Sequence, residues 1–489
     1  MRRLIVILLL SSSALAQPKH PFTFEDMMKL KRIEEPVPSP DGKWVAFAAV
    51  DVDLAANTKT PHIWIVPTAG GESREIIADQ DADRPRWAPD GKRLLFLSSK
   101  ESGQQVWIAD FDGSAGTVAA THRLTAIATE ADGPLWSPDG KNIIFVSNVD
   151  PECTGLPEEA AACNTKELDE AAKSKVKAQI FARLLYRHWN AYKEGKRNHI
   201  FAVSPDGGTP RDLTPGDYDS PVFSLGGQDN YAISPDGQEL CYTSNHDPVE
   251  ATSTNNDLWT VPINPTAATI STHVERGASP VSSSPEPKNI TAENPAGDST
   301  PLYSPDGKYI AYRAQKRPGY EGDLFRLMLY DRRAGTKRDM LNGVWPDWVG
   351  TFIWSPDSSK IFFSSTDDDA RNHGQNSISS VSAENHASNT TIPGTGPIVR
   401  VIRSQPITRG YDDDFAFSPD GKTLFFTRMS IRRPNEIRKL ILPTNIDPYG
   451  VPAGDQITHV NDILFAQIQM SWLETFWFEA PKKPKSKAS

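Results

Sequence analysis

Short apolar runs separated by tight polar turns recur along the whole chain. A Pro-Asp turn, usually ending in glycine, appears seven times, at residues 39–42, 88–91, 137–140, 234–237, 304–307, 355–358 and 418–421. Proline presets the backbone of the second turn position, aspartate can bond neighbouring backbone groups, and glycine adopts the left-handed conformation. Each copy therefore predicts a tight turn between two strands.

The flanks of these turns predict four strands per repeat. Apolar runs such as 44–47 follow the turns, a further run such as 62–66 comes later, and a fourth strand is often marked by an aliphatic-threonine pair such as Leu124-Thr125. The first three turns begin at residues 39, 88 and 137, so the compact repeats are 49 residues apart. This period is typical of a propeller blade. The sequence predicts an all-β fold, a seven-bladed β-propeller of four-stranded antiparallel blades with TolB-like or WD-like repeats.

The predicted propeller spans residues 18–458, with insertions in several blades. An additional Pro-Asp turn at residues 204–207 follows a third strand, so we assign it to the outer hairpin of blade three, and eight blades are the alternative. The longest insertion, from about residue 150 to 197, separates the second and third strands of blade three. Within it, Val176, Ile180 and Leu184 recur at helical spacing, which predicts a helix over residues 166–189.

The N-terminus has the pattern of a secretory signal. Two arginines, a short apolar run and Ala14-Leu15-Ala16 predict a signal peptide over residues 1–16, cleaved after Ala16. No other stretch approaches the roughly 20 apolar residues of a membrane-spanning helix. We therefore expect a periplasmic or secreted protein without a membrane span.

Charge and cysteine content narrow the function classes. The formal net charge of −10 argues against a general nucleic-acid binder, which carries a basic face. Cys153 and Cys163 lie ten positions apart, a plausible local disulfide in an oxidising compartment, whereas Cys241 in a strand-like run predicts a buried thiol. Neither a CxxC pair nor a His/Cys cluster is present, which disfavours a metal site.

No catalytic motif emerges from the chain. It contains no G-x-S-x-G elbow, no HExxH and no P-loop pattern. The acidic triplets at 367–369 and 412–414 lack the spacing of a calcium loop, and we interpret them as solvated loop charge. We predict no catalytic residue, no cofactor and no metal ligand.

Several segments together resemble a known family. They are the first turn with its strand (39–47), Leu184-Leu185-Tyr186-Arg187-His188-Trp189, the run 196–201, the run 317–321 and Asp331-Arg332. In this order they resemble the N-terminal propeller of the prolyl oligopeptidase family, nearest to its exported dipeptidyl-peptidase and acylaminoacyl-peptidase branch. The resemblance covers nearly the whole chain after the signal peptide.

The resemblance implies a role in peptide cleavage that depends on a second domain. Family members carry an α/β-hydrolase domain after the propeller, and residues 459–480 resemble the linker into it, followed by a Lys-rich tail at 481–489 that we expect to be disordered. We therefore expect the substrate-gating portion of an exported serine peptidase, inactive alone, with peptides or a separate hydrolase domain or protein as partners. In such enzymes the propeller contributes groups that hold the substrate, and Arg187 and His188 are the residues that we name for peptide contact. The alternative is that Arg187 and His188 belong to a helix that packs on blade three and have no role in peptide contact.

Two further expectations remain open. A stand-alone TolB-like periplasmic propeller that binds a protein or peptide is the alternative function, because the seven repeats are complete by Thr458 and a closed ring can exist without more chain. If a hydrolase domain is missing, apolar residues between Trp472 and Phe478 are exposed, and we expect self-association.

Overall fold

The Pro-Asp turns join the first and second strands of each blade in the computed structural model. In the first copy the Ser39 hydroxyl donates to Asp41 Oδ1 at 2.6 Å and accepts from Trp44 N at 3.0 Å. Gly42 has a φ of +70°, and Ser358 takes the same left-handed conformation in the one copy without glycine, with a φ of +61°. The turn chemistry predicted from the sequence is confirmed.

The structure describes residues 19–472 except 177, 182, 189–190, 224–227, 265–285, 342–347, 368–374, 384–388, 391–397, 400–404, 409 and 443–452, together with 474, 476 and 478. The predicted signal peptide and Lys-rich tail lie outside the described residues.

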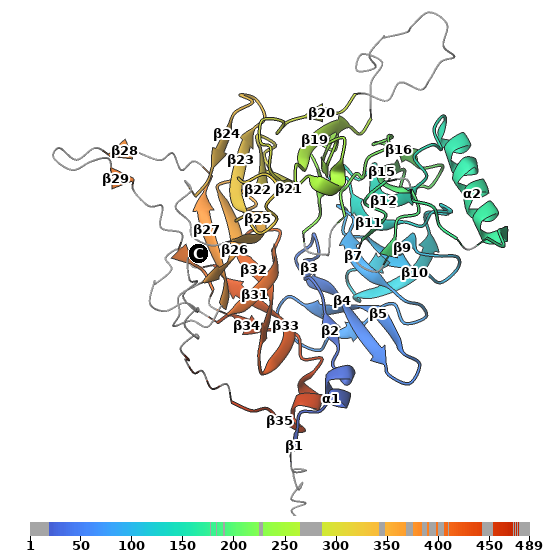
Figure 1. Cartoon of the computed structure of the whole chain (residues 1–489). Coiled ribbons are helices and arrows are strands. Elements are labelled where there is room, and N and C mark those ends of the chain that lie inside the picture. Colours follow the sequence, from blue (N-terminus) through green and yellow to red (C-terminus); the bar gives the residue numbers. More distant parts are fainter. Residues whose placement is uncertain are drawn as a thin grey trace, which may run out of the picture.

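Seven antiparallel blades form a ring around a central axis, which confirms the predicted propeller; we call the interior of the ring the channel (Figure 1). Their strands, in chain order, are as follows. Blade 1 has β2 (Arg32–Ile33), β3 (Val37–Pro38), β4 (Trp44–Asp53), β5 (Thr58–Pro67) and β6 (Arg74–Glu75); blade 2 has β7 (Asp83–Trp87), β8 (Arg93–Ser98), β9 (Gln105–Asp112) and β10 (Thr117–Arg123). Blade 3 has β11 (Asp132–Trp136), β12 (Ile143–Val149), β15 (Arg197–Val203) and β16 (Arg211–Asp212); blade 4 has β17 (Tyr231–Ile233), β18 (Glu239–Ser244), β19 (Asp257–Pro262) and β20 (Lys288–Asn289). Blade 5 has β21 (Asp298–Tyr303), β22 (Tyr309–Ala314), β23 (Arg326–Asp331) and β24 (Lys337–Asp339); blade 6 has β25 (Val349–Trp354), β26 (Lys360–Asp367), β27 (Gln375–Ser382) and β30 (Gln405–Pro406). Blade 7 has β31 (Tyr411–Phe417), β32 (Thr423–Ser430), β33 (Arg433–Ile441) and β34 (Asp455–Gln456). Six blades have four strands, and in blade 1 the first strand is interrupted, so that β2 and β3 both pair with β4.

A few elements lie outside this scheme. Blades 6 and 7 share one sheet because β27 pairs in parallel with β31. The turn at 204–207 joins β15 to β16, so the assignment to the outer hairpin of blade three is confirmed. The remaining elements are β1 (His20–Pro21), α1 (Phe24–Lys29), α2 (Pro157–Lys173), β13 (Arg187–His188), β14 (Ala191–Tyr192), the 3-10 turn η1 (Glu250–Thr252), β28 (Asn389–Thr390), β29 (Ile398–Val399), α3 (Asp462–Phe465) and β35 (Ile468–Gln469).

Indole side chains connect neighbouring blades. Trp87, Trp136 and Trp354 end the inner strands of blades 2, 3 and 6, and each Nε1 donates to a backbone carbonyl on the inner strand of the preceding blade, at 2.9, 3.2 and 3.2 Å. All three rings are buried. These three tryptophans thus fill the space between neighbouring sheets, and each also satisfies its single donor.

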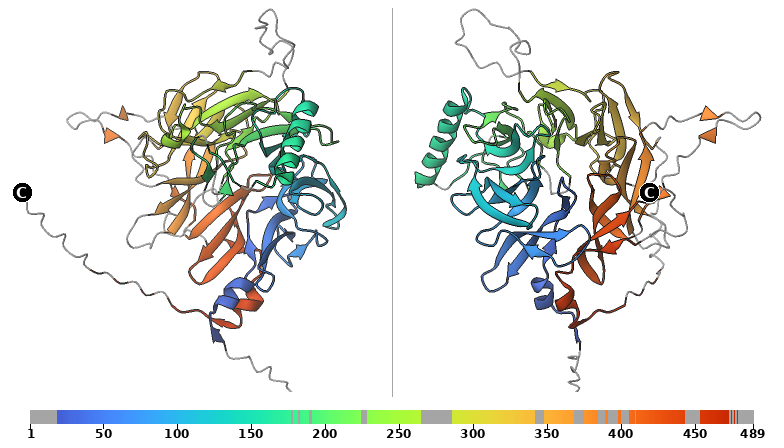
Figure 2. Two further views of the ribbon diagram at one scale, coloured as in Figure 1. Left: turned by 45° about the vertical axis from the view of Figure 1, so that its right-hand side comes forward. Right: turned by 180° about the vertical axis from the view of Figure 1, so that it is seen from behind.

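The ring closes by contacts between blades 1 and 7. Among the residues that the structure describes, no strand from one end of the chain completes the other end's blade; an apolar cluster that includes Phe47, Phe425 and Ile457 fills the junction. Asn461 accepts from Lys31 N at 2.9 Å and donates to its carbonyl at 3.0 Å. β1 also pairs with β35, so α1 and α3 lie side by side at this junction (Figure 2).

The topology divides the connections between the two ends of the ring. In an antiparallel blade, the first and third turns lie at one end, and the second connection and the link to the next blade lie at the other. The latter end, which we call the insertion face, carries the blade-three insertion, the incoming chain before β2 and the outgoing chain after β34. The Pro-Asp turns occupy the opposite face.

Candidate functional site

The blade-three insertion begins with a helix, but not where it was predicted. α2 spans Pro157–Lys173 and ends at Ser174, so the prediction of a helix over 166–189 is wrong beyond residue 173. Val176 and Ile180, which carried the helical periodicity, are 71% and 96% exposed. An amphipathic pattern stabilises a helix only when its apolar side is buried, and these side chains have no core to cover. The observed helix instead starts at a proline followed by two glutamates, which suit a helix N-terminus.

A disulfide ties the start of the insertion to this helix. The sulfur atoms of Cys153 and Cys163 are bonded, and the two Cα atoms are 5.5 Å apart. Cys241 is buried in β18, as predicted.

Arg187 and His188 lie on a two-stranded hairpin rather than on a helix. Arg187 pairs with Tyr192 across β13 and β14. The His188 ring stacks on Phe223, with centroids 4.3 Å apart and planes 4° from parallel. Burial and the nearby Lys193 lower the pKa of His188, so its imidazole is predominantly neutral at pH 7. The structure thus brings the predicted residue His188 together with Phe223, which the sequence did not single out.

A buried ionic cluster fixes this hairpin to the ring. Lys193, just after β14, forms ion pairs with Asp219 and Glu250, and Arg197 Nη1 lies 3.2 Å from Asp219 Oδ2 and 2.9 Å from Glu250 Oε2. All four side chains are at most 16% exposed. Buried charges of this kind are stable only when paired, so loss of one partner is costly. The cluster therefore sets the position of His188 relative to the blades.

Beside Phe223 a cavity of about 520 Å³ opens at the insertion-face end of the channel. Its walls mix polar and apolar surface and come from blades 2, 3 and 4 and the loops beside them. The polar side chains include Arg84, Asp132, Asn148, Asn198, Gln228 and Asp229. This volume lies in the range of small-molecule and short-peptide sites. The site therefore combines one aromatic wall with several hydrogen-bonding groups.

An ion pair spans the cavity from blade 2 to the loop before blade 4. Arg84 Nη2 lies 2.8 Å from Asp229 Oδ1. Burial lowers the pKa of Arg84, but Asp229 and neighbouring groups outweigh burial, so its pKa is raised and the guanidinium stays charged. Arg84 also has a φ of +50°, at the bulge between Asp83 and Arg86 in β7. The bulge and the ion pair together present one positive and one negative group to a ligand.

Acidic residues crowd the adjacent part of the channel. Burial, followed by the charge of Asp83, raises the pKa of Glu34 to about 7. Burial, followed by the charge of Asp413, raises the pKa of Asp414 to about 6. The interpretation of 412–414 as solvated loop charge is wrong, because the triplet lies in β31 and Asp412 is fully buried. The triplet at 367–369 lies largely outside the described residues.

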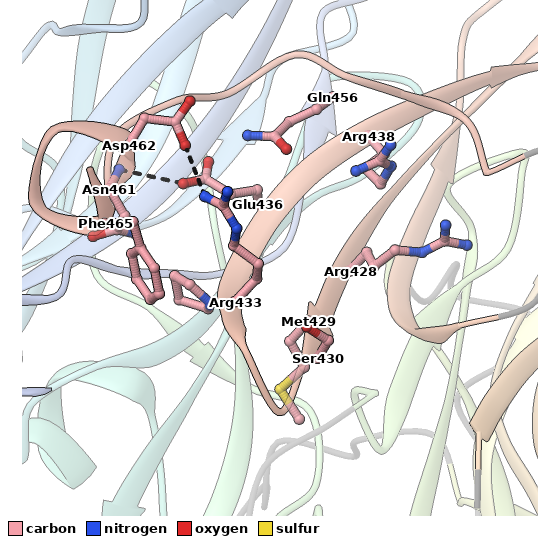
Figure 3. Close-up of a pocket in the computed structure, with 11 residues that line it drawn as sticks. Arg428, Met429, Ser430, Arg433, Glu436, Arg438, Gln456, Asn461, Asp462 and Phe465 are labelled. Carbon is pink, nitrogen blue, oxygen red and sulfur yellow. Dashed lines mark hydrogen bonds and ion pairs between the residues drawn. The ribbon is translucent and has the colours of Figure 1, made fainter. Parts of the chain in front are cut away.

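A second, smaller pocket of about 170 Å³ lies where the chain leaves blade 7 (Figure 3). Arg433 points toward Asp462, with 3.5 Å between Nη1 and Oδ1, and Glu436 accepts from Asn461 N at 3.3 Å and from the Thr458 hydroxyl at 2.5 Å. Burial raises the pKa of Glu436 to about 7, partly offset by these two hydrogen bonds. These polar groups bind one another, and Asn461 also binds the Lys31 backbone where the ring closes.

Metal and membrane features are not evident in the described part of the chain. Within it, no group of three or more His, Cys, Asp or Glu side chains lies close enough to hold a metal ion. None of the helices over those same residues is long and apolar enough to cross a membrane.

Curated relatives of similar sequence are peptidases. Dipeptidyl-peptidase 5 of Porphyromonas gingivalis is 27% identical over 435 residues, covering 86% of this chain and 54% of the relative. The enzyme of the same name from Porphyromonas endodontalis is 26% identical over 469 residues, covering 93% of this chain and 58% of the relative. The chain therefore spans little more than half the length of these relatives. No family model matches it.

Solved structures share the fold. The acylaminoacyl peptidase of Pyrococcus horikoshii superposes with a TM-score of 0.59 at 13% identity, over 93% of this chain and 57% of that chain. The propeller domain of the Trilobed protease from Pyrococcus furiosus, described as having an open velcro topology, gives 0.51 at 13% identity, over 89% and 97%. With the sequence relatives, these likenesses confirm the predicted resemblance to propellers of prolyl oligopeptidase-type peptidases.

Proposed function

We propose that this chain, a propeller like those of prolyl oligopeptidase-type peptidases, is the substrate-gating portion of an exported serine peptidase. In this role the propeller receives a peptide at its insertion face and limits which peptides reach a hydrolase domain. The nucleophile and its partners belong to that domain, so the propeller by itself is inactive.

One observation carries the proposal: the cavity beside Phe223, the anchored hairpin and both ends of the described chain lie on the insertion face. The outgoing chain resembles the crossing into a hydrolase domain, and it leaves the ring on the same side as the cavity. A domain attached there is well placed to cover the cavity mouth. Peptides then bind between the propeller and that domain.

The cavity chemistry suits a short peptide. The Arg84 guanidinium can pair with a carboxylate, Asp229 with an ammonium group, and the Phe223 ring can pack on an apolar side chain. We assign Arg187 and His188 to peptide contact at the rim of this cavity. The stack of His188 on Phe223 holds the rim in place.

Export fits the disulfide of the insertion, because such bonds persist in oxidising compartments. We assign residues 1–16 to a signal peptide on the sequence pattern described above. Mass spectrometry of the protein recovered from periplasm and medium tests this assignment, with Gln17 as the expected first residue. Recovery of the protein with residues 1–16 intact in the cytoplasm contradicts it.

Peptide binding is the experiment that tests the function. We expect fluorescence anisotropy with labelled tetrapeptides to show saturable binding to the purified chain, and we expect no cleavage of dipeptide reporters. R187A and H188A should each weaken binding about tenfold, equivalent to loss of about 1.4 kcal/mol. The matched controls R333A and H122A alter exposed residues in blades 5 and 2 and should leave binding unchanged. Equal affinity in all five proteins, or cleavage by the chain alone, overturns the proposal.

A further inference from the structure

One side chain crosses the channel and binds the backbone of a distant blade. The Gln228 carboxamide accepts from Phe352 N at 3.2 Å and donates to Phe352 O at 3.0 Å. Gln228 belongs to the connection between blades 3 and 4, whereas Phe352 lies on β25, the inner strand of blade 6. The carboxamide therefore engages both hydrogen-bonding groups of a single backbone residue.

The two residues after Gln228 also reach other blades. Asp229 pairs with Arg84 of blade 2, as described above, and Asn230 Oδ1 accepts from Thr300 N of blade 5 at 3.2 Å. Three consecutive side chains thus bind three different blades around the channel. This arrangement holds Gln228 opposite Phe352.

The contact at Phe352 has the pattern of strand pairing. In an antiparallel sheet, a residue exchanges both its N–H and its C=O with one partner residue, and a carboxamide offers the same acceptor and donor. β25 is the edge of its sheet, and Phe352 lies opposite Phe363 of β26. Because Gln228 takes both groups of Phe352, these groups point into the channel, away from β26.

Most other inner strands cannot offer such a donor. The residue two positions before the end of the inner strand is proline in blades 1, 2, 3 and 5, namely Pro36, Pro85, Pro134 and Pro301. Proline has no N–H, and its presence on an edge strand prevents pairing with another chain. Blades 4, 6 and 7 have Tyr231, Phe352 and Phe415 at this position, so their inner edges retain the donor that the prolines remove in the other four blades.

We propose that the channel edge of β25 at Phe352 docks the main chain of an extended peptide, and that Gln228 occupies this place until the peptide displaces it. The inference rests on the proposed peptide-binding function and specifies where the backbone of the peptide binds. Addition of a strand to an exposed edge gives affinity through main-chain hydrogen bonds. Gln228 also lines the 520 Å³ cavity, so a peptide paired with β25 extends into it.

When a peptide displaces Gln228, two hydrogen bonds from Phe352 to the carboxamide are replaced by two to the peptide. Removal of the Gln228 side chain should therefore tighten peptide binding. We expect Q228A to bind a labelled pentaalanine peptide three- to tenfold more tightly than the unaltered protein. Q228E, whose carboxylate still accepts from Phe352 N but cannot donate to Phe352 O, should fall between the two. The matched control Q238A, on the opposite face, should bind like the unaltered protein. Methylation of the central amide nitrogens of the peptide should abolish the increase in affinity expected for Q228A.

Hydrogen exchange at the Phe352 amide gives a second measurement. This amide should be protected in the unaltered protein, exchange faster in Q228A, and become protected again when pentaalanine is added. Failure of the peptide to restore protection, or equal affinities of Q228A, Q228E and the unaltered protein, overturns the docking site. If H188A and R187A still weaken binding in that case, the proposed function survives; absence of peptide binding in every variant removes both.

Discussion

The Asp298 carboxyl is fully buried where blade 4 runs into blade 5. Asn294 donates to its Oδ1 at 2.9 Å. Burial raises the pKa of this group, the hydrogen bonds from Asn294 and Thr291 lower it, and the charges of Asp257 and Glu293 raise it; the net result is a rise from 3.8 to about 8. The folded protein therefore keeps Asp298 protonated at neutral pH, whereas the unfolded chain ionises it near pH 4.

The sign of the pH dependence follows from this difference. Between about pH 4 and pH 8 the folded state binds one more proton at Asp298 than the unfolded state, so stability falls as the pH rises. A shift of about four units corresponds to about 5 to 6 kcal/mol without relaxation of the site, and relaxation lowers the value, so the expected range is about 3 to 6 kcal/mol. D298N removes the titration while keeping a carbonyl oxygen to accept from Asn294. We expect the variant to match the unaltered protein near pH 4 and to be more stable by this amount at pH 9.

Thermal melts between pH 4 and pH 9 measure the effect. At about 2.1 cal/mol/K per residue, unfolding of a chain of this size carries an entropy of about 1 kcal/mol/K, so the difference at pH 9 is about 3 to 6 °C in Tm. The comparison of the two proteins cancels the contributions of Glu34, Asp414 and Glu436 to the pH dependence, because these groups titrate equally in both. D110N, at an exposed position of β9, is the matched control and should not change the profile. Parallel curves for D298N and the unaltered protein would refute the reasoning.

Three other predictions concern the blades, the insertion and the chain end. W354F keeps a buried ring but leaves the blade-5 carbonyl without its donor, so we expect denaturant unfolding to show a loss of about 1 kcal/mol; no loss contradicts a stabilising inter-blade bond. C153S/C163S should speed hydrogen exchange in α2, because closure of this short loop contributes about 3 kcal/mol, with little change in the Tm of the ring; unchanged exchange argues against the disulfide as the helix anchor. Trp472 is 79% exposed, so sizing chromatography should show self-association that W472S reduces, and a monodisperse monomer of the unaltered chain goes against this expectation.

The blade architecture was predictable because its determinants are local. Each Pro-Asp turn encodes its own geometry within four residues, and the apolar runs beside it have the length of buried strands. The aliphatic-threonine pairs were also local signals: Thr125 accepts from Val106 N at 2.9 Å and donates to Gln105 at 2.8 Å. The same local signals recur in the other repeats, so the strand order predicted for one blade could be applied to the others.

The candidate site was less predictable because it depends on contacts between distant segments. Helical spacing at Val176 and Ile180 indicated a helix, but the sequence does not reveal that no core lies beneath those residues. Asp412 appeared to be loop charge because its bidentate partner, Arg428, lies 16 positions away across a strand pair. Gln228 shows no local motif at all, since its role depends on β25 lying across the channel. Its one sequence signal is indirect: the inner strand of blade 6 has no proline at Phe352, a feature that it shares with blades 4 and 7.

Each blade is built from one uninterrupted stretch of chain, and His20 lies beside Ile468 where the ring closes. The two ends of the described fold are therefore neighbours, so a short linker could join them without distorting any sheet. New termini opened between most blades would then cut no strand pairing, and such a circularly permuted ring should assemble. The junction of blades 6 and 7 is the exception, because β27 and β31 pair across it.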